Sequence, residues 1–157
     1  MQQHHTSPVS DPTGWSTNRQ LAARQRTAVQ HEVTRLLDTL APEQRPARHD
    51  PPSDAVRAYR WPARCILQGP AHAVSVSWFP GNPDDGSLGE MMVIVWEGVV
   101  SLPGSARRAP VEAVQVRTLT LQPVDCGVGD WQWQGPDGEP SLSTTALVEY
   151  CREYLRQ

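Results

Sequence analysis

The stretch AHAVSVSWF, residues 71–79, decides the fold class because its side chains alternate along the chain. Val74, Val76 and Trp78 fall on one side of an extended backbone, and the serines between them fall on the other side. This period of two predicts a β-strand. The later stretch MMVIVW, residues 91–96, is apolar at every position, which predicts a central strand covered on both faces.

Further strands are expected around this pair. Segments rich in Pro and Gly, at residues 80–86 and 103–108, predict the turns that reverse the chain. Residues 111–121 predict a third long strand, and residues 131–134 (WQWQ) predict a short strand at a sheet edge. Residues 64–67 predict an earlier edge strand. Because no helical pattern lies between these strands, the sheet is expected to be antiparallel.

Two segments with a period of 3.6 residues flank the strands. The first begins at a helix cap, Ser16 or Thr17, and its apolar positions line one helical face: Val29, Val33, Leu36, Leu37 and Leu40. The second follows a cap at Ser141 or Ser143 and has the corresponding stripe: Leu147, Tyr150, Cys151, Tyr154 and Leu155. The fold class predicted is α+β, with an antiparallel meander of four or five strands flanked by an N-terminal and a C-terminal helix.

The length of 157 residues fits one domain of ordinary size. Residues 1–15 are polar and interrupted by Pro and Gly, which predicts a disordered tail. Residues 16–157 are expected to form a single α+β domain. Within it, residues 41–55 contain four prolines and predict an extended connector.

Composition excludes several classes of partner. The chain has 17 acidic and 14 basic residues and a net charge of −3, so it lacks the positive field of a general nucleic-acid binder. No apolar run is long enough to cross a membrane, and no secretory signal begins the chain, so a cytoplasmic protein is expected. All the basic residues are Arg. An absence of Lys is typical of a GC-rich coding sequence, and Arg also suits salt-bridged contacts between proteins.

The sequence contains no complete motif for a metal or a cofactor, so neither is expected. His31-Glu32 resembles the start of a zinc-hydrolase helix, but Arg35 occupies the position of the second His. The glycines of residues 127–132 precede a strand, whereas a dinucleotide loop would precede a helix. The three cysteines are widely spaced, which argues against disulfides and zinc knuckles.

Cys126 is the one candidate nucleophile, because it lies on a predicted loop, whereas Cys65 and Cys151 fall on apolar elements. A leading helix, a meander, a loop with a Cys and a further helix together resemble the order of elements in ubiquitin-conjugating enzymes. The resemblance implies a conjugating or transfer enzyme with Cys126 as its nucleophile. The family's His-Pro-Asn motif does not precede Cys126.

Six Trp against one Phe is the most unusual feature of the composition. Two helices of moderate length leave one face of such a sheet with little to pack against, unless the helices divide between the faces or another subunit covers one of them. Trp and Arg are enriched at protein-binding hot spots. The leading hypothesis is therefore a non-enzymatic protein–protein interaction module, such as a structural subunit, adaptor, chaperone or neutraliser. It is expected to bind another protein or to self-associate through a sheet face or edge rich in Trp and Arg. Its candidate partner-binding residues are Trp131, Trp133, Trp61, Arg107 and Arg108. A third hypothesis is a small-ligand binder with a Trp-lined cavity between the sheet and the C-terminal helix.

Overall fold

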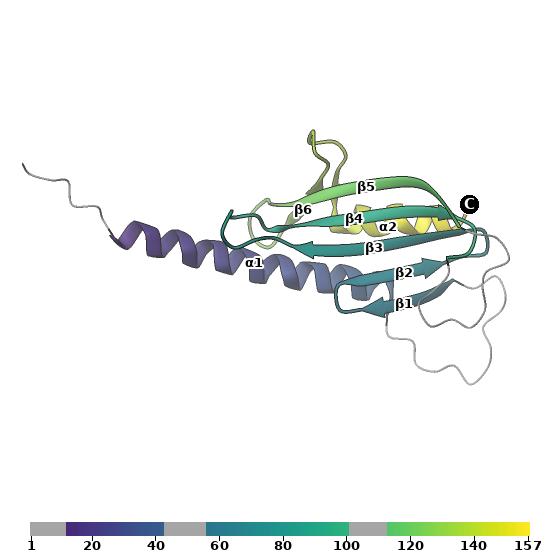
Figure 1. Cartoon of the computed structure of the whole chain (residues 1–157), viewed down its shortest axis with the longest axis horizontal. Coiled ribbons are helices and arrows are strands. Elements are labelled where there is room, and N and C mark those ends of the chain that lie inside the picture. Colours follow the sequence, from purple (N-terminus) through teal and green to yellow (C-terminus); the bar gives the residue numbers. More distant parts are fainter. Residues whose placement is uncertain (1–11, 43–55, 101–112) are drawn as a thin grey trace, which may run out of the picture.

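The structure is a computed structural model that describes residues 12–42, 56–100 and 113–157. It contains a long helix α1 (Pro12–Leu40) and a short helix α2 (Thr144–Leu155), with seven strands between them (Figure 1). The strands are β1 (Arg57–Trp61), β2 (Arg64–Gln68), β3 (His72–Pro80), β4 (Gly89–Glu97), β5 (Val114–Asp125), β6 (Trp131–Gln134) and β7 (Ser141–Ser143).

All seven strands belong to one sheet, in which each strand pairs antiparallel with its neighbour in the sequence. This confirms the α+β class and the antiparallel meander flanked by two helices. The expected number of strands, four or five, was too low. The two additional strands are β1, whose sequence RAYRW has no apolar alternation, and β7, which has only three residues. Because β7 pairs with β6, the WQWQ strand is not at the sheet edge as predicted.

The ends of the helices differ in how closely they follow the sequence prediction. Helix α1 begins at Pro12 and not at Ser16 or Thr17, so residues 12–15 belong to the helix and not to a tail. Pro is favoured in the first turn of a helix because the amide hydrogen that it lacks has no partner there. The N-cap of α2 is Ser143, whose side chain accepts a hydrogen bond from the amide of Ala146 at 3.1 Å. The rest of the proposed tail and most of the proposed connector lie outside the described residues.

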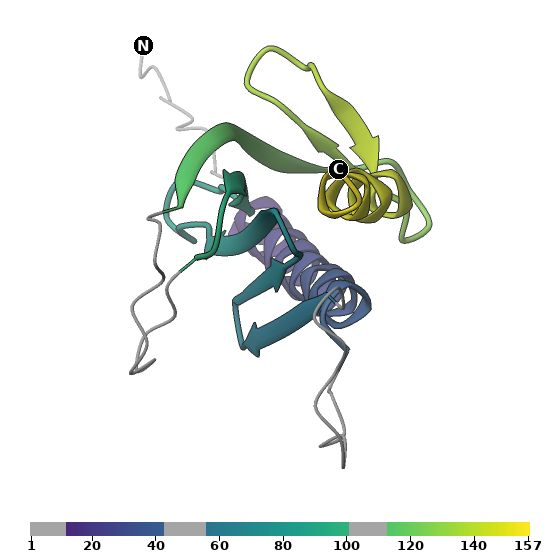
Figure 2. The same ribbon diagram turned by 90° about the vertical axis from the view of Figure 1, so that its right-hand side faces the viewer.

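Both helices lie on the same side of the sheet, which curves around them (Figure 2). The hydrophobic core fills the space between the sheet and the two helices. It takes its side chains from the apolar stripe of α1, from alternate positions of the strands and from α2. Val33, Leu36, Val93 and Leu147 are all fully buried there.

This arrangement corrects the prediction for MMVIVW, which forms most of β4. Met91, Val93 and Val95 face the helices and are buried, but Met92, Ile94 and Trp96 face the other way and are only half-buried. Among the residues that the structure describes, helices therefore cover only one face of this strand.

A chain of hydrogen bonds ties the two helices to strand β6. The indole Nε1 of Trp133 donates to the hydroxyl of Thr144 at 3.0 Å, and that hydroxyl donates to Oε1 of Glu32 at 2.5 Å. Arg35 also donates to Glu32, at 2.6 Å. Burial raises the pKa of Glu32, but the hydrogen bonds from Arg35 and Thr144 and the charge of Arg35 outweigh it, so the net pKa lies below its ordinary value.

Candidate partner-binding surface

The sheet presents a broad surface on the side away from the helices, which we call the outer face. The cross-strand register defines it: Tyr59 lies opposite Ile66, Ile66 opposite Ser75, and Ser75 opposite Ile94. Alternation along each strand places every second residue on the same side. The outer face comprises Arg57, Tyr59, Trp61, Arg64, Ile66, Ala73, Ser75, Ser77, Phe79, Glu90, Met92, Ile94 and Trp96.

Two large aromatic side chains of the outer face are in contact with solvent. Phe79 is 50% exposed and Trp61 is 38% exposed. The guanidinium of Arg64 lies over the Trp61 ring, 5.6 Å from its centroid, in a cation–π contact. Exposed rings of this kind contribute strongly to binding when a partner covers them.

The outer-face side chains differ in size from strand to strand. Between Ala73 and Ser77, strand β3 carries only small side chains on this face. Ala73 is fully buried and Ser75 is 4% exposed, although no described helix covers this side. The indole Nε1 of Trp96 donates to the hydroxyl of Ser75 at 3.1 Å, so the large ring of β4 leans over the small residue of β3. Met92, Ile94 and Trp96 therefore form a ridge of larger side chains along β4, beside the small and mostly buried residues of β3.

Charges on the outer face are separated by sign. Arg57 and Arg64 lie on β1 and β2, whereas Glu90 lies at the start of β4. A surface with unlike charges on opposite sides of an apolar centre is able to pair with a second copy of itself, because a two-fold axis brings the unlike charges together.

The predicted partner-binding residues have different locations. Trp131 is 4% exposed and Trp133 is fully buried, with the Trp133 ring against Trp78 in an edge-to-face contact whose centroids are 6.2 Å apart. These two rings are core side chains and cannot contact a partner while the core is closed. Trp61 does lie on an exposed surface, the outer face. Arg107 and Arg108 lie outside the described residues.

Sequence reasoning missed four residues of this surface: Phe79, Met92, Ile94 and Trp96. The signal that could have found them is the run MMVIVW together with the helix count. A strand that is apolar on both faces needs cover on both, and two helices that pack together cover only one.

Cys126 is exposed and begins the tight turn between β5 and β6. Its amide donates to the carbonyl of Asp130 at 2.9 Å, and its Sγ lies 3.9 Å from the carbonyl oxygen of Val124. Cys65 and Cys151 are buried, and burial raises the pKa of each thiol to about 12. Cys126 is thus the accessible thiol of the three.

Within the part of the chain that the structure describes, no three His, Cys, Asp or Glu side chains gather as a metal site would require. None of the helices in that part is long and apolar enough to cross a membrane. No protein-family model, curated protein or solved structure matches this chain.

Proposed function

We propose that this protein is a non-enzymatic protein–protein interaction module whose outer face packs against another protein chain. The observation that carries the proposal is the placement of both described helices on one side of the sheet, so that no helix of residues 12–42, 56–100 or 113–157 covers the apolar side chains of the other side. Half-exposed Phe79 and the ridge of Met92, Ile94 and Trp96 supply the apolar contact.

The chemistry of the outer face favours a protein over a small molecule. Aromatic and aliphatic side chains spread over four paired strands form an extended surface, whereas small ligands bind in concave pockets. The arginines beside Trp61 provide polar contacts at the border of the apolar area, as in protein interfaces.

The experiment compares self-association and partner capture in the wild type and in Phe79→Ser with Ile94→Thr. Both substitutions lie on the outer face and avoid the core. We expect sedimentation equilibrium to show association of the wild type, or co-purification from the native source to recover a protein that the double variant does not recover. Leu21→Ser, a change of an exposed apolar residue on α1, is the matched control and keeps the association.

A wild-type chain that stays monomeric and whose co-purifying proteins are unchanged in the double variant contradicts the proposal. Circular dichroism of both variants shows that each is folded before the comparison is made. Loss of association in Leu21→Ser as well as in the double variant also contradicts it, because the effect would then not belong to the outer face.

The conjugating enzyme suggested by the order of the elements stays a second candidate, favoured by the exposure of Cys126. Its exposure alone makes Cys126 react before the buried thiols, so selective alkylation is not sufficient evidence for it. An enzymatic thiol reacts faster than free cysteine at neutral pH because it is held as a thiolate. An alkylation rate at or below that of free cysteine removes this candidate.

A further inference from the structure

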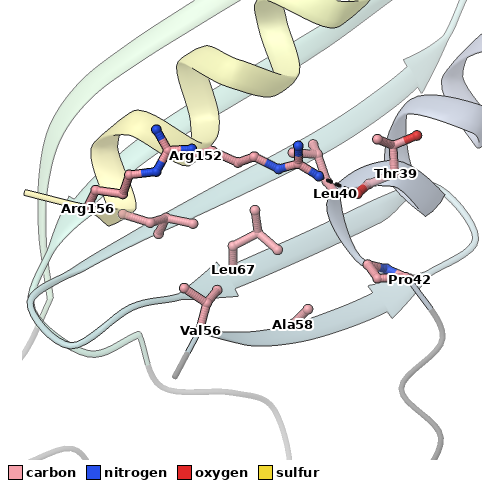
Figure 3. Close-up of a pocket in the computed structure, with 9 residues that line it drawn as sticks. Thr39, Leu40, Pro42, Val56, Ala58, Leu67, Arg152 and Arg156 are labelled. Atoms are coloured by element: carbon pink, nitrogen blue, oxygen red, sulfur yellow. Dashed lines mark hydrogen bonds between the residues drawn. The ribbon is translucent and has the colours of Figure 1, made fainter. Parts of the chain in front are cut away.

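A pocket of about 390 Å³ lies on the helix side of the sheet, between the end of α1, the β1–β2 hairpin and the last turn of α2 (Figure 3). It is separated from the outer face by the sheet. An inference about this pocket is therefore independent of the proposed protein-binding function. It also differs from the Trp-lined cavity expected from the sequence, because its lining contains no Trp.

The base of the pocket is apolar. Leu67 of β2 and Leu155 of α2 belong to the hydrophobic core and also line the pocket. Ala58 and Val56 complete the wall beside the hairpin, and Val56 is 45% exposed. A short alkyl chain placed here removes apolar surface of the protein and of the ligand from water.

Two guanidinium groups border the opening. Arg152 pairs with Glu149 at 3.2 Å, and Arg156 pairs with the same carboxylate at 3.6 Å. Two positive charges thus share one negative charge. Both arginine side chains are accessible, with 43% and 68% of their surfaces exposed. A second carboxylate would balance the charge of this group and accept hydrogen bonds from it.

The other polar groups at the opening already have partners. Arg152 donates to the backbone carbonyl of Thr39 at 3.3 Å, which satisfies one of the free carbonyls at the end of α1. Asp38, the acidic side chain nearest the end of α1, is paired with Arg60 at 3.1 Å. The excess positive charge of Arg152 and Arg156 is therefore the electrostatic feature that a ligand at this opening meets.

We propose that this pocket binds a small amphipathic carboxylate, such as a medium-chain fatty acid. The alkyl chain lies against Leu67 and Leu155, and the carboxylate accepts hydrogen bonds from Arg152 and Arg156. The volume lies within the range of about 300–1,000 Å³ that is typical of small-ligand sites.

The test is a titration of the full chain with octanoate, octanol and octylamine. Binding is measured by calorimetry and by the shifts of the amide NMR signals of Ala58, Leu67 and Leu155. Octanoate is expected to bind and to shift these amides. Octanol is expected to bind about tenfold more weakly, because it cannot form the charge-assisted hydrogen bonds. Octylamine, which carries a positive charge, is expected not to bind.

Two arginine variants and a filled pocket identify the site. Arg156→Gln weakens octanoate binding about tenfold and leaves octanol binding unchanged, whereas Arg24→Gln, at an exposed position of α1 outside the pocket, changes neither. Ala58→Leu fills the pocket and abolishes both. Arg152→Gln is expected to act like Arg156→Gln, but it also breaks the contact with Thr39, so Arg156→Gln decides the outcome if the Arg152 variant does not fold.

The proposal is overturned if octanoate and octanol bind equally, if the shifted amides lie elsewhere, or if Arg156→Gln binds octanoate as the wild type does. It is also overturned if Ala58→Leu is folded and still binds.

Discussion

At the scale of single residues, the Thr144 side chain links α2 to strand β6 and to helix α1 by hydrogen bonds. Its hydroxyl accepts from the buried indole of Trp133 and donates to Glu32. Thr144→Val keeps the shape but leaves the indole N–H without a partner, which should lower the free energy of unfolding by about 1–3 kcal/mol. Chemical denaturation measures the change.

Thr145→Val is the matched control, because Thr145 is the next residue of α2 and is exposed. It should change stability by less than about 0.5 kcal/mol. Equal effects of the two substitutions would show that the helix propensity of Val, and not the hydrogen-bond chain, causes the loss.

Glu32 makes part of the stability depend on pH. Its pKa in the folded protein is below its ordinary value of 4.5, so its charged form stabilises the fold above that value. This contribution is lost as the pH falls below 4.5 and through the lowered pKa. The difference in unfolding free energy between the wild type and Glu32→Gln should therefore shrink on acidification, and a constant difference contradicts the assignment.

The thiols give a prediction that requires no substitution. Cys126 is exposed, whereas burial raises the pKa of Cys65 and Cys151 to about 12. A thiol reagent such as Ellman's reagent at neutral pH should modify one thiol in the folded protein and all three after denaturation. Rapid reaction of two or three thiols in the folded state would show that the core opens readily.

Residue-level features were predictable where one local rule decides them. The buried positions of α1 follow from the helical spacing of Val29, Val33 and Leu36, and the low exposure of Cys151 follows from its place on the second stripe. The bond from Thr144 to Glu32 was not predictable, because it joins residues far apart in the sequence. The burial of Trp131 and Trp133 was missed because the sequence does not show that the face of β6 carrying both rings packs into the core shared with α1 and α2.

At the scale of elements, the cap of α2 resolves an alternative that the sequence left open. Ser143 and not Ser141 is the N-cap, since its hydroxyl accepts from the amide of Ala146. Ser143→Ala should destabilise the protein by about 1 kcal/mol. Ser141→Ala, at the exposed start of β7, is the control and should have little effect on the melting temperature. The reverse order of the two effects contradicts the assignment.

Strands were predictable where alternation or a long apolar run marks them, as in β3 and β4. Strand β1 was not, because Arg57, Tyr59 and Trp61 give its outer side a polar and aromatic character without a clear period. Only its pairing with β2 makes it a strand. The outer face was half predictable. A shortage of helices was evident from the sequence and Trp61 does lie on the outer face, but Trp131 and Trp133 are buried in the core.

At the scale of the whole molecule, α2 completes the core. Leu147, Val148, Cys151 and Leu155 are its buried apolar side chains. Burial of each Leu or Val side chain is worth about 1.5–3 kcal/mol, against a total stability of about 5–15 kcal/mol. A chain that ends before Thr144 should therefore lose its cooperative unfolding transition, monitored by tryptophan fluorescence. A retained transition would show that α1 and the sheet fold without it.

The order of the elements has a consequence for biosynthesis. Each strand of the meander pairs with the strand that follows it in the sequence, so the strands are able to pair one after another as the polypeptide leaves the ribosome. The apolar stripe of α1 is synthesised before any strand. Helix α2, which packs into the same core as α1, is synthesised after all the strands. During synthesis the apolar stripe of α1 therefore stays exposed to water until the strands and α2 that cover it have been made.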